Sequence, residues 1–366
     1  MSYTERKELF KKCEELRGIP LITYVTSIRP NNSSRMAGDA IHQIIAQVQS
    51  IPAEKEEIDF LIISNGGDPI TALRIVNILR ERFKKVSVLI PFVAFSAATI
   101  LSLGADEIVM HPYSNLGPVD PQLSVIKPNG AGQHSQLQFS SEDIRNYIEF
   151  IRSDVGITDQ AHLISAFNSL ATDVGPLPIG SSKRGQQLSL SLSAKMLETH
   201  LDDKNKAATI AKSLNTSYYH HGYALSRQEA KSIGLNVVYP NPELESVLWD
   251  IWLNYCDEMK CDREFSPAAE LMKNAQAKQL INNIPVVNLP ANTPPQAAQQ
   301  MIIQIAQQNA QITQQAPIEV VSLLAAIESL TAAHAVHCTQ SIAYWRDANM
   351  NLAINITEYS KGWEKK

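Results

Sequence analysis

The sequence is poor in several features that would place it in a familiar class of protein. Its 366 residues include only four cysteines, which are scattered along the chain. Scattered cysteines do not make a disulfide framework, and Cys256 and Cys261 have too few companion ligands for a metal site. No stretch approaches the ~20 apolar residues that cross a bilayer. The charged helix expected over residues 1–19 also lacks the apolar core of a signal peptide. We therefore expect a cytoplasmic protein with four free thiols, no transmembrane segment, no metal and no cofactor.

Charge is also scarce. Thirty-two Lys and Arg residues stand against 37 Asp and Glu, so the formal net charge is only -5, and charged residues make up 19% of the chain. A surface that binds phosphate backbones needs clustered basic residues, so the composition argues against DNA or RNA as a partner. What the chain has is apolar material, 44% of all residues. That is enough for one large core with an appendage, or for two domains.

Strand-like and helix-like segments alternate in the first third of the chain. The expected strands are residues 20–28, 58–64, 85–92 and 106–112, and the helices between them are residues 37–50, 69–82 and 96–103. The second strand, IDFLIIS, is a continuous apolar run of the kind that is buried on both faces. Asp68 is placed to cap the helix that begins at Pro69. Alternation at this spacing predicts an α/β fold with right-handed βαβ units and a mostly parallel sheet.

The rest of the chain divides by composition. Residues 127–180 are expected to be an inserted segment with two amphipathic helices, near 142–153 and 159–172, and helical periodicity returns over 188–214. We expect one domain over 20–262, a Gln/Ala/Pro-rich linker with an amphipathic stretch over 263–317, and a long C-terminal helix over 318–366. This last prediction rests on apolar residues three apart, at Val321, Leu324, Ile327 and Leu330.

Two turns carry the chemistry, and both follow strands whose carboxyl ends meet at one edge of a parallel sheet. Gly66-Gly67 lets the backbone approach a ligand closely. Ser96 stands at a strand-to-helix turn, where the helix dipole favours the negative charge that develops when a carbonyl is attacked. Each signal alone is ordinary, because most serines at such positions are helix caps. Their spacing, with one βαβ unit between them, makes a catalytic interpretation stronger.

These residues resemble a known family. ISNGGDP, residues 63–69, is similar to the glycine turn of Clp proteases and signal peptide peptidase A. Residues 95–121 are similar to their serine helix and to the strand and turn after it. SRQEAKSIGLNVV, residues 226–238, resembles their closing helix and strand. The closest resemblance is to the serine dehydrogenase proteinase family, a relative of signal peptide peptidase A in the Clp protease/crotonase superfamily, over about residues 20–255. The sequence offers no GxGxxG turn to support a dehydrogenase.

The resemblance implies a Clp protease/crotonase-like ββα superhelix with a mostly parallel sheet, to which we add a helical C-terminal extension. It also implies a homo-oligomer. Ser96 would be the nucleophile, and the backbone N–H groups of Gly67 and Ala97 would form the oxyanion hole.

The general base is not settled by the resemblance. Clp proteases use a histidine, but the position that aligns with it here is Val119 or Asp120. Signal peptide peptidase A uses a lysine, which serves as a base when burial lowers its pKa. Lys183, in an expected glycine-rich loop before a long helix, is the first candidate, although a solvated surface lysine is an equal interpretation. Lys127 and His111 are the reserves.

The sequence thus predicts a serine peptidase with a Ser96–Lys183 dyad that hydrolyses peptides or unfolded protein. One alternative is a crotonase-like enzyme acting on acyl-thioesters, and another is a non-catalytic oligomeric scaffold whose C-terminal helix is an interaction arm. The adjacent His220 and His221 are interpreted as structural, because neighbouring residues point in different directions and no third metal ligand is evident.

Overall fold

The protein is described from a computed structural model, for residues 2–128, 134–218, 220–282, 289–290, 292–309, 316–346 and 351–366. The chain divides into two compact units. The first unit contains residues 1–26, 35–255 and 327–333, and the second contains residues 27–34, 256–326 and 334–366. This division differs from the expected domain over 20–262, because the first unit also takes in the N-terminal helix and a short segment from near the C-terminus.

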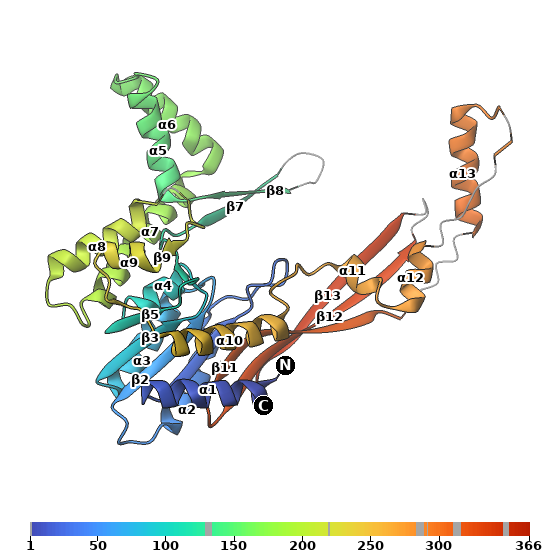
Figure 1. Cartoon of the computed structure of the whole chain (residues 1–366). Helices are drawn as coiled ribbons and strands as arrows, with labels where there is room; N and C mark the ends of the chain where they lie inside the picture. The colour runs from blue at the N-terminus through green and yellow to red at the C-terminus, as the bar shows by residue number, and fades with distance from the viewer. Residues whose placement is uncertain are drawn as a thin grey trace. The chain divides into compact units, whose positions relative to one another are not determined.

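A parallel sheet forms the centre of the first unit (Figure 1). Its strands are β1 (Leu21–Thr26), β2 (Glu57–Ile63), β3 (Lys85–Ile90), β5 (Glu107–Met110) and β10 (Val237–Val238). Their order is β10-β5-β3-β2-β1, and each neighbouring pair is parallel. The six residues of β1 and the last six of β2 are all buried, as continuous apolar runs require. The expected α/β fold with a mostly parallel sheet is confirmed.

Helices connect these strands. Residues Gly38–Ala40 form a short 3-10 turn that leads into α2 (Ile41–Ser50), and α3 (Pro69–Arg82) and α4 (Ala97–Ser102) follow the next two strands. Each crossover steps the sheet in the same direction, so right-handed connections place these helices on one face. The carboxylate of Asp68 accepts hydrogen bonds from the N–H groups of Ile70 and Thr71, which confirms the expected cap.

A buried ion pair ties the N-terminal helix to the rest of the first unit. Helices α1 (Tyr3–Arg17) and α10 (Pro242–Met259) lie side by side (Figure 1). The Arg6 guanidinium, 0% exposed, donates to both carboxylate oxygens of Glu328 at 2.8 Å. The Tyr255 hydroxyl donates to the same carboxylate, also at 2.8 Å. Both charges are therefore satisfied, which a buried pair requires.

The inserted segment projects from the sheet of the first unit (Figure 1). It consists of the hairpin β7 (Leu123–Pro128) and β8 (His134–Phe139), then α5 (Ser141–Ser153) and α6 (Gln160–Val174). The two expected amphipathic helices are thus confirmed. The helical stretch after them is divided into α7 (Pro176–Leu197) and α8 (Lys204–Thr216), and β9 (Leu225–Ser226) and α9 (Arg227–Ser232) lead back to the sheet.

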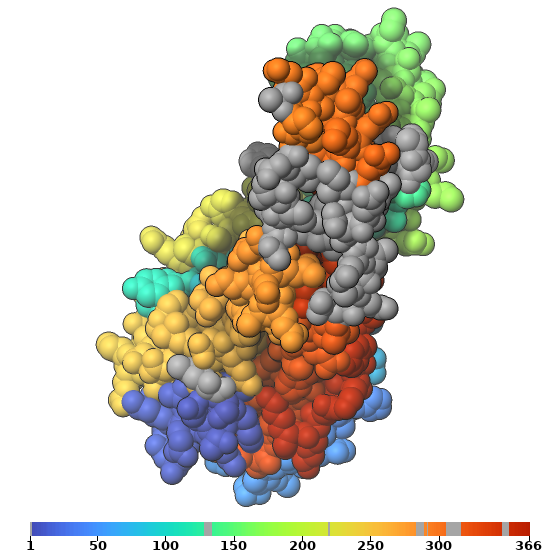
Figure 2. Space-filling model, turned by 90° about the vertical axis from the view of Figure 1, so that its right-hand side faces the viewer, coloured from blue at the N-terminus to red at the C-terminus, as the bar shows by residue number. Residues whose placement is uncertain are grey.

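The second unit contains helices and an antiparallel arrangement of strands. The helices are α11 (Pro267–Leu271), α12 (Ala275–Asn282) and α13 (Pro295–Asn309), and the strands are β11 (Ile318–Glu328), β12 (Ala333–Arg346) and β13 (Leu352–Lys365). The last two residues of β11 and the first of β12 belong to the first unit. Their order is β11-β12-β13, with β12 and β13 antiparallel. Leu271 and Ala277 pack with Ile342 and Tyr344 in a small core. In Figure 2 the orange surface of α11 and α12 lies against the red surface of the strands.

The expected C-terminal helix over 318–366 is wrong. The described part of this region forms three strands. Burial in the second of them alternates at first, with Ala333 and Ala335 buried and His334 and Val336 less so. The residues three apart that suggested a helix coincide with apolar runs that also suit a strand. The start of the region, Pro317-Ile318, also lacks a capping residue. No helix within the described ranges is long and apolar enough to cross a membrane.

Candidate active site

Ser96 lies between β4 (Val93–Ala94) and α4 in a strained backbone conformation, with φ 53° and ψ -117°. A positive φ is uncommon for a residue with a side chain and is typical of functional turns. The hydroxyl makes no capping hydrogen bond to the helix, and the residue is partly exposed. The ordinary interpretation of Ser96 as a helix cap is therefore not what the geometry shows.

The glycine turn packs directly against the backbone of Ser96. A Cβ atom on Gly66 would lie 2.5 Å from the carbonyl oxygen of Phe95 and 2.9 Å from the nitrogen of Ala97. Gly66 also has φ 94° and Gly67 has φ 150°. A Cβ atom on Gly67 would collide with the carbonyl oxygen of Met36. Both positions therefore require glycine, for close approach and for conformation.

Two backbone N–H groups near the serine turn, those of Gly67 and Ala97, are candidate oxyanion donors. In the part of the chain that the structure describes, neither the Gly67 nor the Ala97 N–H donates a hydrogen bond. The neighbours of Gly67 are occupied, since Met36 N–H donates to Gly66 O at 2.8 Å and Asp68 N–H donates to Met36 O at 2.9 Å. Free donors of this kind are the chemical requirement for holding an oxyanion.

A second, small sheet fixes what surrounds the serine. Strand β4 pairs in parallel with β6 (Asn115–Leu116), and β6 pairs antiparallel with β9. The hydroxyl of Thr99 accepts from the Gly117 N–H at 3.1 Å and lies 2.7 Å from the Ala94 carbonyl oxygen, to which it can donate. The serine helix is thereby joined to the chain that leaves β6 towards Asp120.

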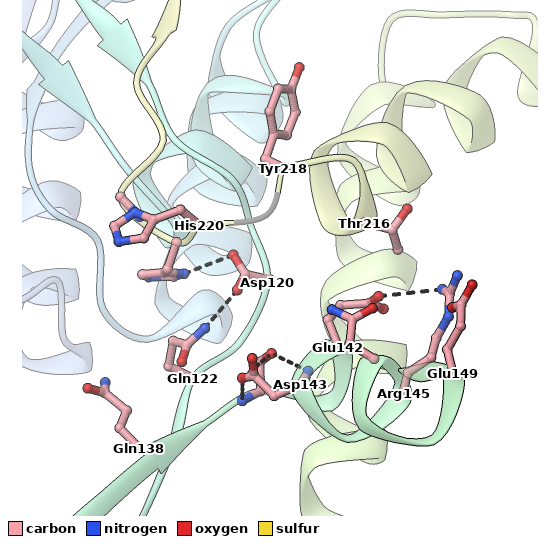
Figure 3. A pocket seen from close by; sticks show the side chains of 14 residues that line it. Asp120, Gln122, Gln138, Glu142, Asp143, Arg145, Glu149, Thr216, Tyr218 and His220 are labelled. Carbon is pink, nitrogen blue, oxygen red and sulfur yellow. Dashed lines mark hydrogen bonds and ion pairs between the residues drawn. The ribbon is translucent and has the colours of Figure 1, made fainter. Parts of the chain in front are cut away.

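Asp120 and His221 form a hydrogen-bonded pair beyond the ends of β6 and β9. The Asp120 carboxylate, 9% exposed, lies with Oδ1 2.9 Å from Nδ1 of His221, while Oδ2 accepts from Gln122 at 2.7 Å (Figure 3). This hydrogen bond raises the pKa of His221 above its ordinary value, against the opposing effect of burial. A carboxylate on Nδ1 leaves Nε2 to accept a proton.

This pair was missed by the sequence interpretation, which took His220 and His221 as structural. The available signal was the alignment itself, because it places Val119 or Asp120, and not a histidine, at the position of the Clp histidine. A catalytic histidine would then have to come from elsewhere in the chain.

A cavity of about 620 Å³ adjoins the pair. Asp120 and His221 line it together with Tyr218, and residues of α5, among them Glu142 and Arg145, complete it (Figure 3). The cavity is large enough for side chains of a peptide.

Residues 16–145 match the family of ClpP-like SDH-type serine proteinases. The match covers the glycine turn, Ser96 and Asp120. It confirms the resemblance found in the sequence, the Clp-like fold of this segment and the serine-peptidase class.

Two curated relatives are also similar, both uncharacterized proteins of Methanocaldococcus jannaschii. One is 26% identical over 240 residues, which are 65% of this chain and 68% of that protein. The other is 24% identical over 220 residues, which are 60% of this chain and 61% of that protein. The chain thus spans about two thirds of the length of each.

Among solved structures, two proteases show a remote similarity. A mutant of the membrane-bound stomatin-specific protease 1510-N is 19% identical, with 62% of this chain and 84% of that chain covered and a TM-score of 0.34. ClpP1 from Listeria monocytogenes is 13% identical, with 64% and 99% covered and a TM-score of 0.32.

Lys183, the base expected from the sequence, lies in a helix and not in a loop. It occupies the third turn of α7 and is exposed, and its Nζ donates to Gln186 on the same helix at 3.2 Å. The buried residues of this helix are Ser182, Gln186, Ser189, Leu192, Ser193, Met196 and Leu197, and Lys183 is not among them. Lys183 also lines a second cavity, between α5 and α7. In the described part of the chain it makes no hydrogen bond with Ser96.

The other two candidate bases, Lys127 and His111, interact with residues other than Ser96. Lys127 lies in β7, not in an exposed loop, and its Nζ pairs with Asp173 at 2.6 Å. His111 is buried and stacked on Trp249, with ring centroids 4.9 Å apart, and burial lowers its pKa. Its Nδ1 accepts the N–H of Tyr113.

Proposed function

We propose that the protein is a serine peptidase in which Ser96 attacks the scissile carbonyl and the N–H groups of Gly67 and Ala97 hold the oxyanion. The observation that carries the proposal is the strained turn at Ser96, packed against a glycine turn that leaves both donors free. Removing one such donor typically costs ~10²–10³ in rate.

His221, oriented by Asp120, is the base that this geometry favours. The chain order would be serine, aspartate, histidine, an order known in other hydrolases, and a triad is recognised by its geometry rather than by its order. Strand β9 lies two positions from β4, on the far side of β6. The backbones of β4 and β9 are therefore about 10 Å apart, and the imidazole side chain of His221 spans part of that distance. Catalytic hydrogen bonds often shorten only when substrate binds.

The chemistry then follows in two steps. Nε2 of His221 takes the proton of the Ser96 hydroxyl as its oxygen bonds to the carbonyl carbon, and it returns that proton to the leaving amine when the C–N bond breaks. A water molecule attacks the acyl-enzyme by the same route and releases the acid. Asp120 keeps the imidazole in the required tautomer throughout.

A Ser96–Lys183 dyad is the alternative mechanism. For Lys183 to act as a base its ammonium must lose a proton near neutral pH, which requires burial or nearby positive charge. Its exposure and its hydrogen bond to Gln186 support this mechanism less well than the pair at Asp120 supports the other.

Peptides or unfolded protein are the proposed substrates, because the cavity beside Asp120 is large enough to hold side chains of a peptide. Action as a homo-oligomer in the cytoplasm is part of the same proposal, by analogy with the family.

A fluorophosphonate probe tests the proposal, because it labels an activated serine. The wild-type chain should be labelled, and Ser96→Ala should abolish labelling while keeping the thermal unfolding midpoint. A Ser96→Ala protein that is still labelled would show that another residue reacts. A folded wild-type chain that is never labelled would favour a crotonase-like enzyme or a scaffold.

Two further variants separate the bases. His221→Gln should lower the labelling rate by ~10²-fold or more, whereas Lys183→Met, a matched change at the other candidate, should leave it unchanged. The reverse pattern, in two folded proteins, would establish the Ser96–Lys183 dyad.

A further inference from the structure

Helix α10 ends in a cap that brings two cysteines together. Lys260 has φ 56°, and the N–H of Cys261 donates to the carbonyl oxygen of Cys256 at 2.8 Å. The N–H of Lys260 donates to Asp257 O at 3.2 Å. These two bonds define a Schellman motif, in which the residues here occupied by Cys256 and Cys261 often make a side-chain contact.

The backbone bond between the two cysteines limits their separation. With standard bond lengths, a 2.8 Å bond from N to O allows the two Cα atoms to be at most about 6.7 Å apart. Disulfides form between cysteines whose Cα atoms are about 4.4–6.8 Å apart. The two thiols also influence each other, because Cys256 contributes to raising the pKa of Cys261.

The other two cysteines of the chain differ in exposure. Cys13 is 0% exposed and Cys338 is 5% exposed, whereas Cys256 and Cys261 are both partly exposed. A reagent in solution therefore reaches the pair at the end of α10 before it reaches the others.

We propose that Cys256 and Cys261 form a redox-active dithiol, a modification site that closes to a disulfide across the cap of α10. A disulfide of low molecular weight is the oxidant. One cysteine thiolate attacks it, forms a mixed disulfide and releases one thiol. The second cysteine then attacks the bound cysteine sulfur and releases the second thiol, so that two electrons and two protons pass from the chain to the oxidant.

The environment sets the character of this couple. Burial raises the pKa of Cys256, and it raises the pKa of Cys261 to about 11. Few thiolates exist at neutral pH, so the first attack is slow and accelerates as pH rises. Thiols of high pKa are also poor leaving groups, so the disulfide, once formed, is reduced slowly.

The closed form fixes the chain where it passes from one unit to the other. Tyr255 is the last residue of the long segment in the first unit, and Cys256 begins the next segment of the second. A disulfide over residues 256–261 closes a short loop, so its stabilising effect is modest compared with that of a long-range bridge.

The test uses the full chain and dithiobis-nitrobenzoate, an aromatic disulfide. The folded wild-type chain should release two equivalents of thiol and keep no adduct, with a mass lower by two hydrogens and a peptide cross-linked between Cys256 and Cys261. Cys256→Ser should release one equivalent and retain one adduct on Cys261. Cys338→Ser is the matched control and should behave as the wild type.

Three outcomes overturn the proposal. They are a wild-type chain that keeps two separate adducts, a chain that releases no thiol while it remains folded up to alkaline pH, and a cross-link that involves Cys13 or Cys338. A second measurement is independent of the reagent: oxidation should raise the thermal unfolding midpoint of the wild type and leave that of Cys256→Ser unchanged.

Discussion

Replacing Gly66 by alanine should damage both the stability of the first unit and the reactive serine. The added Cβ would lie 2.5 Å from the carbonyl oxygen of Phe95 and 2.9 Å from both the Ala97 nitrogen and the Ser96 Cβ. Two of these three neighbours are backbone atoms, so they can yield only by moving the turn that carries the serine.

The magnitude follows from two contributions. A residue with a side chain at φ 94° costs about 1–2 kcal/mol in conformational energy. Overpacking of a tight site adds about 1–3 kcal/mol. We therefore expect Gly66→Ala to lower the free energy of unfolding by about 2–5 kcal/mol. Its labelling rate with a fluorophosphonate should fall by ~10²-fold, because a displacement of about 1 Å at a reacting group has that effect.

Gly18 provides a matched control. It also has a positive φ, 70°, but a Cβ there would meet nothing within 4 Å. Gly18→Ala should therefore lose only the conformational part, about 1–2 kcal/mol, and keep its labelling rate. Urea unfolding and probe labelling of both variants decide the matter. If Gly66→Ala and Gly18→Ala lose the same free energy of unfolding and keep the same labelling rate, the glycine turn does not position Ser96.

Three further predictions concern charge and assembly. Asp120→Asn should lower the labelling rate by ~10²–10⁴-fold and shift its acid limb to lower pH, because Asp120 raises the pKa of His221. The raised pKa of His221 stabilises the folded protein fully below the ordinary value near 6.5, and this stabilisation is lost as pH rises through the folded value. The free energies of unfolding of wild type and Asp120→Asn should therefore differ most in acid. Equal pH profiles in urea unfolding would contradict this. Glu328→Gln should cost about 3–5 kcal/mol in the same assay, since it leaves the buried Arg6 without a counter-charge, and a loss below about 1 kcal/mol would mean that water reaches the pair. Light scattering at micromolar concentration should give a multiple of the chain mass, and a monomer would refute the proposed homo-oligomer.

The sequence predicted the parallel sheet because its strands carry their own signal. The last four residues of strand β2, 60–63, are apolar and buried, and Asp68-Pro69 marks the start of the next helix by a local hydrogen bond. The serine and glycine turns were likewise recognisable in the sequence. The strained backbone at Ser96 and the close approach at Gly66 restrict which residue types can occupy these positions.

What could not be predicted depends on contacts between distant segments. Asp120 and His221 are 101 residues apart and meet through β6 and β9, each of only two residues. Strands so short have no periodicity to read. The strands near the C-terminus were not predicted for another reason. The apolar residues around Leu324 and Ile327 fit a helical spacing and a strand equally well until their burial is known.

The ion pair between Arg6 and Glu328 has a consequence for the order in which the protein can be made. The two partners are 322 residues apart in the sequence, so Arg6 emerges from the ribosome long before Glu328 has been added to the chain. A buried charge without its partner is costly, and α1 therefore cannot dock fully while the chain is still being translated up to residue 328. Because α1 belongs to the same compact unit as Ser96, that unit acquires its full stability only after residue 328 has been synthesised.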